Sequence, residues 1–170
     1  MSETTGASYA SAGVDIEAGD RAGMSLDQQV EELGRTLGEE LLEPTRIYSL
    51  DCLALTRTSE VHAFSHITGG GLAANLARVI PDGLHATVDR STWAPGAIFD
   101  LVGTAGQVER LELEKTLNMG VGMMAVVPAE SVDAALTTLA DRGLDAWVAG
   151  EITERGDKDS GAELVGDYAK

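Results

Sequence analysis

A glycine-rich junction joins an apolar segment to a helical pattern in the stretch SHITGGGLAANLARVIP, residues 65–81. Backbone amides at such a junction bind anions, because their N–H groups lack partners and the helix dipole favours negative charge. Thr68 adds a hydroxyl donor, and His66 could exchange a proton with a ligand. The spacing is that of neither a P-loop nor a dinucleotide fingerprint, so a phosphate site and a structural corner both stay open. The glycines concerned are Gly69, Gly70 and Gly71.

A second candidate is the stretch LNMGVGMM, residues 117–124. Asn118 stands at the end of a predicted helix, and Gly120 and Gly122 would let the backbone come close to another group. The alternative is a left-handed helix cap followed by a strand that contains glycine.

The third candidate is AGVDIEAGD, in which Asp15, Glu17 and Asp20 lie among glycines such as Gly13. Their spacing is not that of a known calcium loop, which favours solvated carboxylates over metal ligands. Cysteine-rich metal spacing and a nucleophile elbow are also missing from the sequence. We therefore predict no metal site, and we interpret Cys52 as a buried thiol.

Periodic patterns predict the elements that must position these groups. Apolar residues three and four apart indicate helices over 25–43, 46–57, 72–80, 108–118 and 129–143, with another starting near Pro95. Strand patterns cover 61–67, 85–91, 121–128 and 146–153. The run 121–128 is the most hydrophobic, and we expect a central strand buried on both faces. The alternation predicts an α+β or α/β sandwich, with helices covering a mixed sheet.

Composition divides the 170 residues into three parts. Residues 1–23 are rich in glycine and small residues, and we expect them to be flexible. Residues 24–153 suit one domain. Residues 154–170 are polar and are predicted to be a frayed tail, although Leu164, Val165 and Tyr168 could dock.

Charge limits the ligands that this protein can attract. The chain has 28 acidic and 12 basic side chains, a formal charge of -16. This charge repels nucleic acid, and a phosphorylated ligand would need local backbone N–H groups or a cation. The sequence has neither an apolar run of about 20 residues, as a membrane span requires, nor a signal-peptide pattern. We therefore expect a cytoplasmic protein without a membrane or nucleic-acid partner.

Four stretches in order resemble one enzyme family: SYASAGVDIEAGDRAG, LLEPTRIY, HITGGGLAANLARVIP and LEKTLNMGVGMMAVVP. They are similar to phosphoribosylformylglycinamidine cyclo-ligase, the aminoimidazole ribonucleotide synthetase of purine biosynthesis. The resemblance extends from Ser8 to about Ile152 and implies that the domain is a three-layer α/β/α fold. Selenophosphate synthetases and thiamine-phosphate kinases are related alternatives, but EPTRIY and NMGVGMM favour the purine enzyme.

The resemblance implies an ATP- and magnesium-dependent ligase that closes the imidazole ring of formylglycinamidine ribonucleotide. By analogy, Thr68 and the three glycines would hold a phosphate beside His66, the implied catalytic residue. Asn118 and Gly120 would line the same cleft, and Gly13 and Asp15 would belong to a loop over the ligand. The family often has a lysine where this chain has Ala10, which argues against a charge role there.

The resemblance also exposes a missing part. In the family, a large domain with the Mg-ATP signature stands between the segments that resemble AGVDIEAGD and EPTRIY, whereas here Gly23 is followed directly by Met24. Phosphoryl activation depends on charge neutralisation around the triphosphate, and nothing here replaces that constellation. The first hypothesis is therefore a truncated cyclo-ligase that is not competent alone. The second is a non-catalytic phosphate-binding or association module that forms a homodimer or joins an intact subunit.

Overall fold

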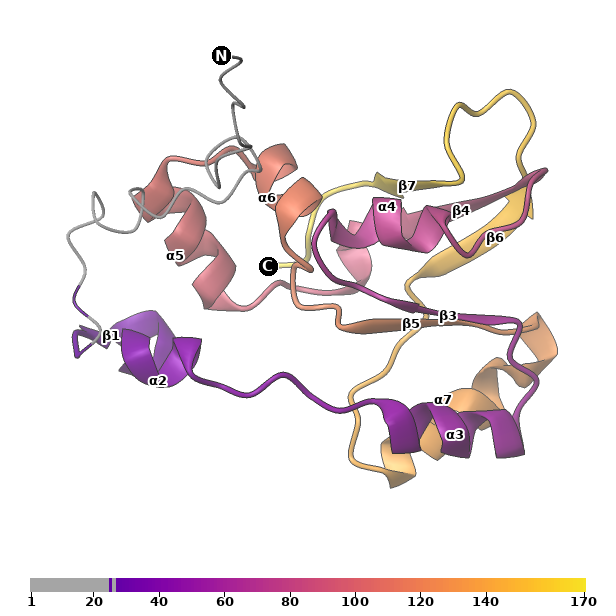
Figure 1. Ribbon diagram of the computed structural model, residues 1–170, viewed down its shortest axis with the longest axis horizontal. Helices are drawn as coiled ribbons and strands as arrows, with labels where there is room; N and C mark the ends of the chain where they lie inside the picture. Colours follow the sequence, from indigo (N-terminus) through magenta and orange to yellow (C-terminus); the bar gives the residue numbers. More distant parts are fainter. Residues whose placement is uncertain (1–24, 26) are drawn as a thin grey trace, which may run out of the picture.

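The computed structural model describes residue 25 and residues 27–170, and within them strands and helices mix in an α+β fold (Figure 1). The strands form three small sheets: β1 (Gln29–Val30) with β2 (Arg35–Thr36), β3 (Ala63–His66) with β5 (Met123–Val126), and β6 (Gly150–Glu154), β4 (Leu84–Asp89) and β7 (Ala162–Val165). The α-helices are α2 (Leu37–Leu41), α3 (Ser49–Thr58), α4 (Gly71–Ala77), α5 (Ala97–Gly106), α6 (Arg110–Thr116) and α7 (Val132–Asp141). The predicted α+β class is confirmed.

The three-stranded sheet is mixed, as predicted. Its central strand β4 pairs antiparallel with β6 and parallel with β7. Gly150 permits the first pairing, because a Cβ at this position would overlap the carbonyl of Thr87 on β4. Inward-facing Ala86 and Val88 of β4 are each only 2% exposed. The centre of this sheet therefore forms one wall of the core.

Helices cover both sides of the β3–β5 pair. In Figure 1, α3 and α7 lie together on one side of the pair and α4 lies on the other. Helices α3 and α7 are joined by the ion pair from Arg142 Nε to Asp51 Oδ1, at 2.7 Å. The apolar face of α4, with Leu72 and Leu76 each 2% exposed, packs into the core. Burial of such side chains contributes about 1.5–3 kcal/mol each, so α4 is fixed by packing despite its short length.

A buried ion pair fastens the end of β4 to α6. The guanidinium of Arg90, in the 3₁₀ turn η3 (Arg90–Thr92), donates from Nε to Glu114 Oε1 at 2.8 Å and from Nη2 to Oε2 at 2.6 Å. Its Nη1 donates to the carbonyls of Leu164 and Gly166, and the group lies over the ring of Tyr168. One arginine thus holds β4, α6 and the C-terminal segment together.

The predicted N-terminal helix over 25–43 is wrong for most of its length. The segment forms the β1–β2 pair, joined by the 3₁₀ turn η2 (Glu31–Leu33) and Gly34, whose φ of 65° is left-handed, and only α2 is α-helical. Thr36 caps α2, in a capping box with Glu39. A glycine in the left-handed region ends helical hydrogen bonding, and the leucine spacing could not reveal this.

Two expectations about strands also need correction. Strand β5 is not a central strand buried on both faces, because within the described residues it pairs only with β3 and its Ala125 is exposed. The segment 154–170 is not a frayed tail, because it contains β7 and places Tyr168 against Trp93, with ring centroids 5.2 Å apart. Parallel pairing of β7 with β4 is a non-local interaction, which the local polar composition does not reveal.

Removing the Arg90 guanidinium should destabilise the fold strongly. We expect Arg90→Ala to lower the free energy of unfolding by about 3–5 kcal/mol, because it leaves the nine-tenths buried carboxylate of Glu114 without its main partner. Lys115→Ala is the control: it breaks an exposed pair with Glu112 and should cost less than about 1 kcal/mol. Urea unfolding followed by circular dichroism measures both, and equal small effects would contradict this role.

Candidate functional site

The predicted glycine junction forms a tight turn between β3 and α4. Beyond the end of β3, the amide of Ile67 donates to the carbonyl of Gly122 at 2.9 Å, which continues the β3–β5 pairing to the edge of the turn. Gly70 and Gly71 then adopt φ angles of 100° and 73°. The amide of Gly71 donates to the carbonyl of Thr68 at 3.1 Å and closes the turn.

The three glycines have different roles in this turn. A Cβ on Gly71 would overlap the backbone carbonyl of Glu114, so Gly71 is required for the close packing of the turn on α6. A Cβ on Gly69 would point into open space, and its φ is not left-handed. Gly70 needs its left-handed backbone but is also uncrowded. Gly71 therefore supports the structural interpretation, whereas Gly69 and Gly70 leave room for a ligand.

Asn75 of α4 holds the turn in shape. Its side-chain Nδ2 lies 3.1 Å from the carbonyl of Thr68, 3.3 Å from that of Gly69 and 2.7 Å from that of Gly71. These carbonyls therefore point inward, toward a side chain that is only 6% exposed. Within the described residues, the amides of Gly69 and Gly70 donate to no backbone carbonyl. The turn thus leaves N–H groups free to meet an acceptor.

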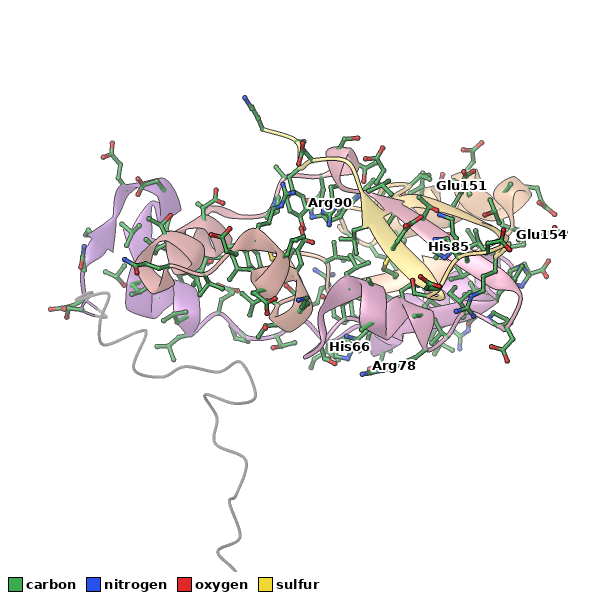
Figure 2. The ribbon with its side chains drawn as sticks, turned by 90° about the horizontal axis from the view of Figure 1, so that it is seen from above. His66, Arg78, His85, Arg90, Glu151 and Glu154 are labelled. Carbon is green, nitrogen blue, oxygen red and sulfur yellow. The ribbon has the colours of Figure 1, made fainter. Side chains whose placement is uncertain are left out.

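A cation lies beside the turn. Arg78 Nη1 donates to Asn75 Oδ1 at 3.1 Å, and Nη2 is 3.8 Å from the position that a Cβ on Gly70 would occupy. Figure 2 shows Arg78 and His66 at the same margin of the molecule. A guanidinium, a hydroxyl on Thr68 and free amides form a donor set that suits a phosphate.

His66, the implied catalytic residue, is exposed at the end of β3. Its ring meets the edge of the Tyr48 ring at a centroid distance of 5.9 Å. Tyr48 in turn packs on Gly122, where a Cβ would overlap its hydroxyl. The absence of a side chain at Gly122 thus lets the Tyr48 ring, and not a ligand, approach the backbone. This contact orients Tyr48 toward His66.

The second candidate, around Asn118 and Gly120, forms the turn that precedes β5. Asn118 Oδ1 accepts from the amide of Gly120 at 3.0 Å, while Met119 and Gly120 have left-handed φ angles of 50° and 90°. Trp93 Nε1 donates to the Met119 carbonyl at 3.0 Å and anchors the turn. Because the Asn118 carboxamide already accepts this bond, its oxygen is committed mainly to the turn.

The structure brings the two turns to one end of the β3–β5 pair. His66 stands opposite Met123 in the antiparallel register, so the chain leaves β3 where it enters β5. Gly71 also packs on α6, the helix that leads into the second turn. The topology is therefore consistent with the prediction that the stretches 65–81 and 117–124 border one cleft. The binding roles of their residues stay predictions.

Other residues singled out by the sequence divide into two groups. Gly13, Asp15, Glu17 and Asp20 lie outside the described residues. Among residues 25 and 27–170, no group of three His, Cys, Asp or Glu could hold a metal ion.

Cys52 is half-buried, and burial raises the pKa of its thiol, which fits an unreactive side chain.

His85 lies on β4, and the contacts of its buried ring are structural. It is 1% exposed, with Nδ1 2.8 Å from the Ser160 carbonyl and Nε2 3.2 Å from Glu163 Oε1. These contacts connect β4 to β7 and to the loop before it. His85 therefore stabilises the sheet and lies outside the candidate site.

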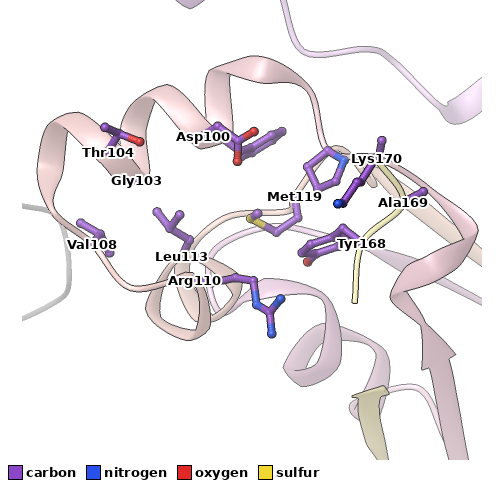
Figure 3. A pocket seen from close by; sticks show the side chains of 13 residues that line it. Asp100, Gly103, Thr104, Val108, Arg110, Leu113, Met119, Tyr168, Ala169 and Lys170 are labelled. Carbon is purple, nitrogen blue, oxygen red and sulfur yellow. The ribbon is translucent and has the colours of Figure 1, made fainter. Parts of the chain in front are cut away.

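An open cavity of about 570 Å³ lies between α5, α6 and the C-terminal segment (Figure 3). Its walls are mainly apolar, with Phe99, Leu113 and Met119, and Arg110 at the rim is paired with Asp167 at 2.7 Å. Burial raises the pKa of Tyr168, another lining residue, to about 12, which keeps its hydroxyl neutral. Sequence patterns did not indicate this cavity, whose lining includes the Tyr168 hydroxyl, buried without a hydrogen-bond partner among the described residues, and Lys170.

Sequence reasoning also missed Asn75 and Arg78. They follow Gly71 at positions i+4 and i+7, which places all three on one helical face. This spacing was visible in GLAANLAR, but an asparagine and an arginine on a surface helix usually indicate a solvated face. Only the structure shows that Asn75 is buried beneath the turn.

Comparisons with known proteins give one consistent result. A family model described as AIR synthase related protein, C-terminal domain, matches residues 2–162. The chain is 75% identical over 153 residues to a Streptomyces fradiae protein named "Putative phosphoribosylformylglycinamidine cyclo-ligase", covering 88% of this chain and 84% of that protein.

Longer relatives bear the same enzyme name. A phosphoribosylformylglycinamidine cyclo-ligase of an Anaeromyxobacter species is 51% identical over 141 residues, which is 82% of this chain but 41% of the relative. The Desulfatibacillum aliphaticivorans enzyme of that name is 40% identical over 144 residues, 85% of this chain and 42% of the relative. The chain thus spans about two fifths of these two relatives.

Substitution of the glycines should separate packing from binding. We expect Gly71→Ala to lower the free energy of unfolding by more than about 3 kcal/mol, since its methyl group would force α4 and α6 apart. Gly69→Ala should change stability by about 0.5 kcal/mol or less, because its methyl group would enter open space. Thermal and urea unfolding measure both, and a tolerated Gly71→Ala would refute the packing role.

Proposed function

The chain belongs to the AIR synthase related protein C-terminal domain family, and from this premise we propose that it binds the phosphate of a ribonucleotide substrate within a phosphoribosylformylglycinamidine cyclo-ligase. The substrate would be formylglycinamidine ribonucleotide, in keeping with the names of its relatives. The phosphate would lie on the turn formed by Thr68, Gly69 and Gly70. The proposed role of the chain is in purine biosynthesis, and its proposed location is the cytoplasm.

One observation supports the proposal most directly: the Asn75-held turn presents free amides beside Arg78. In a chain with a formal charge of -16, long-range attraction of an anion is absent, so binding depends on such a local donor set. The amides and the Thr68 hydroxyl belong to the turn, and the guanidinium comes from Arg78 at the end of α4. Gly71 packs the turn on α6 and makes it rigid before a ligand arrives.

His66 has the position for proton exchange with the bound substrate. It is two residues before Thr68, is exposed, and is oriented by the edge contact with Tyr48. An imidazole can accept or donate a proton near neutral pH, which suits ring closure by an attacking nitrogen. Asn118 and Gly120 would border the substrate by backbone approach, and Gly13 and Asp15 would close over it.

The described residues do not fit Mg-ATP. No acidic cluster among them could hold the metal, and the turn offers one free guanidinium for a triphosphate. Activation of the amide oxygen by ATP would need donors and a cation supplied by another chain or domain. We therefore expect the isolated chain to bind the ribonucleotide without converting it.

A second function, subunit association, is favoured by an exposed apolar surface. It runs from the end of α2 through the extended linker into α3, and comprises Leu41, Leu42, Ile47, Leu50 and Leu53, which are 45–81% exposed. Exposed large apolar side chains gathered on neighbouring segments mark protein interfaces. The partner would be a second copy of the chain or an intact cyclo-ligase subunit.

Within the described residues, no helix is long and apolar enough to cross a bilayer.

Calorimetric titration with formylglycinamidine ribonucleotide tests the binding proposal. We expect the wild-type chain to bind it, and Gly69→Val to weaken binding at least about tenfold, because the branched side chain would occupy the space above the turn without backbone strain. Gly96→Val is a matched control, since Gly96 also has open space and a φ of -62°. No binding by folded wild type would refute the proposal, and turnover of Mg-ATP would refute the expected lack of catalysis.

Light scattering after size-exclusion chromatography tests association. We expect the wild-type chain to dimerise at micromolar concentration, or to join an intact cyclo-ligase, and Leu50→Lys to prevent either, since Leu50 is 69% exposed. Substitution of an exposed side chain should leave the melting temperature unchanged. A wild-type chain that stays monomeric alone and beside the intact enzyme would contradict this second function.

A further inference from the structure

We infer that Arg78 provides the charge selectivity of the proposed site, and that Asn75 is the positioning residue that aims it at the turn. The ligand class would be a phosphate monoester in its dianionic form, such as the 5′-phosphate of a ribonucleotide. The inference rests on the proposed function and specifies which side chains carry out its recognition step.

Asn75 joins the turn and the guanidinium through opposite ends of one carboxamide. Its Nδ2 faces three turn carbonyls, at 2.7–3.3 Å, and its Oδ1 accepts from Arg78 Nη1 at 3.1 Å. The hydroxyl of Thr68 also lies 3.4 Å from Oδ1. Because Asn75 is 6% exposed and fixed by these contacts, it sets where the guanidinium stands relative to the turn.

Arg78 retains its full charge toward solvent. Within the described residues it forms no ion pair, although the chain has 28 acidic side chains. Five other arginines are paired with carboxylates: Arg35, Arg46, Arg90, Arg110 and Arg142. Arg57 and Arg155 share the lack of an ion pair within the described residues, but neither lies at the end of α4 beside the turn. The one side-chain contact of Arg78 is to a neutral amide, so an incoming anion need not displace a carboxylate.

The geometry brings Arg78 beside Gly70 of the turn. Its Nη2 is 3.8 Å from the position that a Cβ on Gly70 would occupy, the same distance as Asn75 Nδ2. A phosphate that accepts from the amides of Gly69 and Gly70 would therefore also reach the guanidinium. A guanidinium fork donates two parallel hydrogen bonds to phosphate, which a lysine cannot reproduce.

Charge selectivity follows from this arrangement. The amides and the Thr68 hydroxyl would bind any oxyanion, whereas the guanidinium favours the ligand with the larger negative charge. Because Arg78 is exposed, salt screens the attraction. Affinity for a phosphate monoester should therefore rise as the pH takes the phosphate through its second ionisation, near pH 6, and fall as salt is added.

Titration of the full chain with ribose 5-phosphate, with ribose as the neutral comparison, tests the role of Arg78. We expect Arg78→Ala to weaken ribose 5-phosphate binding about tenfold or more and to abolish most of its salt and pH dependence. Arg78→Lys should recover only part of the affinity. Arg57→Ala removes the same charge from an exposed position on α3, and should change affinity less than about twofold.

A double-mutant cycle tests the role of Asn75. Asn75→Asp places a carboxylate within reach of Arg78, and should weaken binding as Arg78→Ala does. Combining the two changes should add little further loss, since both remove one interaction. A purely structural Asn75 would instead give losses of binding that add to those of Arg78→Ala, and this result would refute its positioning role.

The outcomes separate this inference from the proposed function. If wild type binds ribose 5-phosphate, Gly69→Val loses binding and Arg78→Ala behaves like Arg57→Ala, the proposed function stands and the role of Arg78 is refuted. If the folded wild type does not bind ribose 5-phosphate, both are refuted.

Discussion

The buried ion pair between Arg90 and Glu114 is the constraint on which the arrangement of this domain depends. Both side chains are more than nine-tenths buried, and charges in that setting persist only when paired and hydrogen-bonded. The same guanidinium ties two carbonyls of the C-terminal segment to the end of β4. Helix α6 therefore has one position relative to the mixed sheet. Because Gly71 packs on the backbone of Glu114, that position also fixes the glycine turn.

The local part of this fold could be predicted from the sequence. Helix α7 and strands β3, β4 and β6 follow from apolar periodicity. Helix α3 was also predicted, although its Leu50 and Leu53 are exposed. The failures share a physical cause, which is that distant contacts override local pattern. Gly34 turns a leucine-rich segment into a strand pair, and pairing with β4 orders a polar segment as β7. Likewise, no local signal connects Arg90 to Glu114.

The candidate site was predicted in part. The pattern TGGG located the turn and left two interpretations open, a structural corner and a phosphate site. Gly71 has the structural role, whereas Gly69 and Gly70 leave room for a ligand. Resemblance to the cyclo-ligases favoured a phosphate, and this ligand class stays a prediction. Asn75 and Arg78 were missed, because the sequence does not show that Asn75 is buried or that Arg78 has no carboxylate partner within the described residues.

The most direct measurement is a backbone and arginine side-chain NMR titration of the ¹⁵N-labelled chain with formylglycinamidine ribonucleotide. The account predicts that the largest chemical-shift changes occur at the amides of Gly69 and Gly70 and at Arg78 Nε, because these donors would meet the phosphate. Changes centred instead on the cavity between α5 and α6, at Thr104 and Arg110, would contradict the assignment of the site.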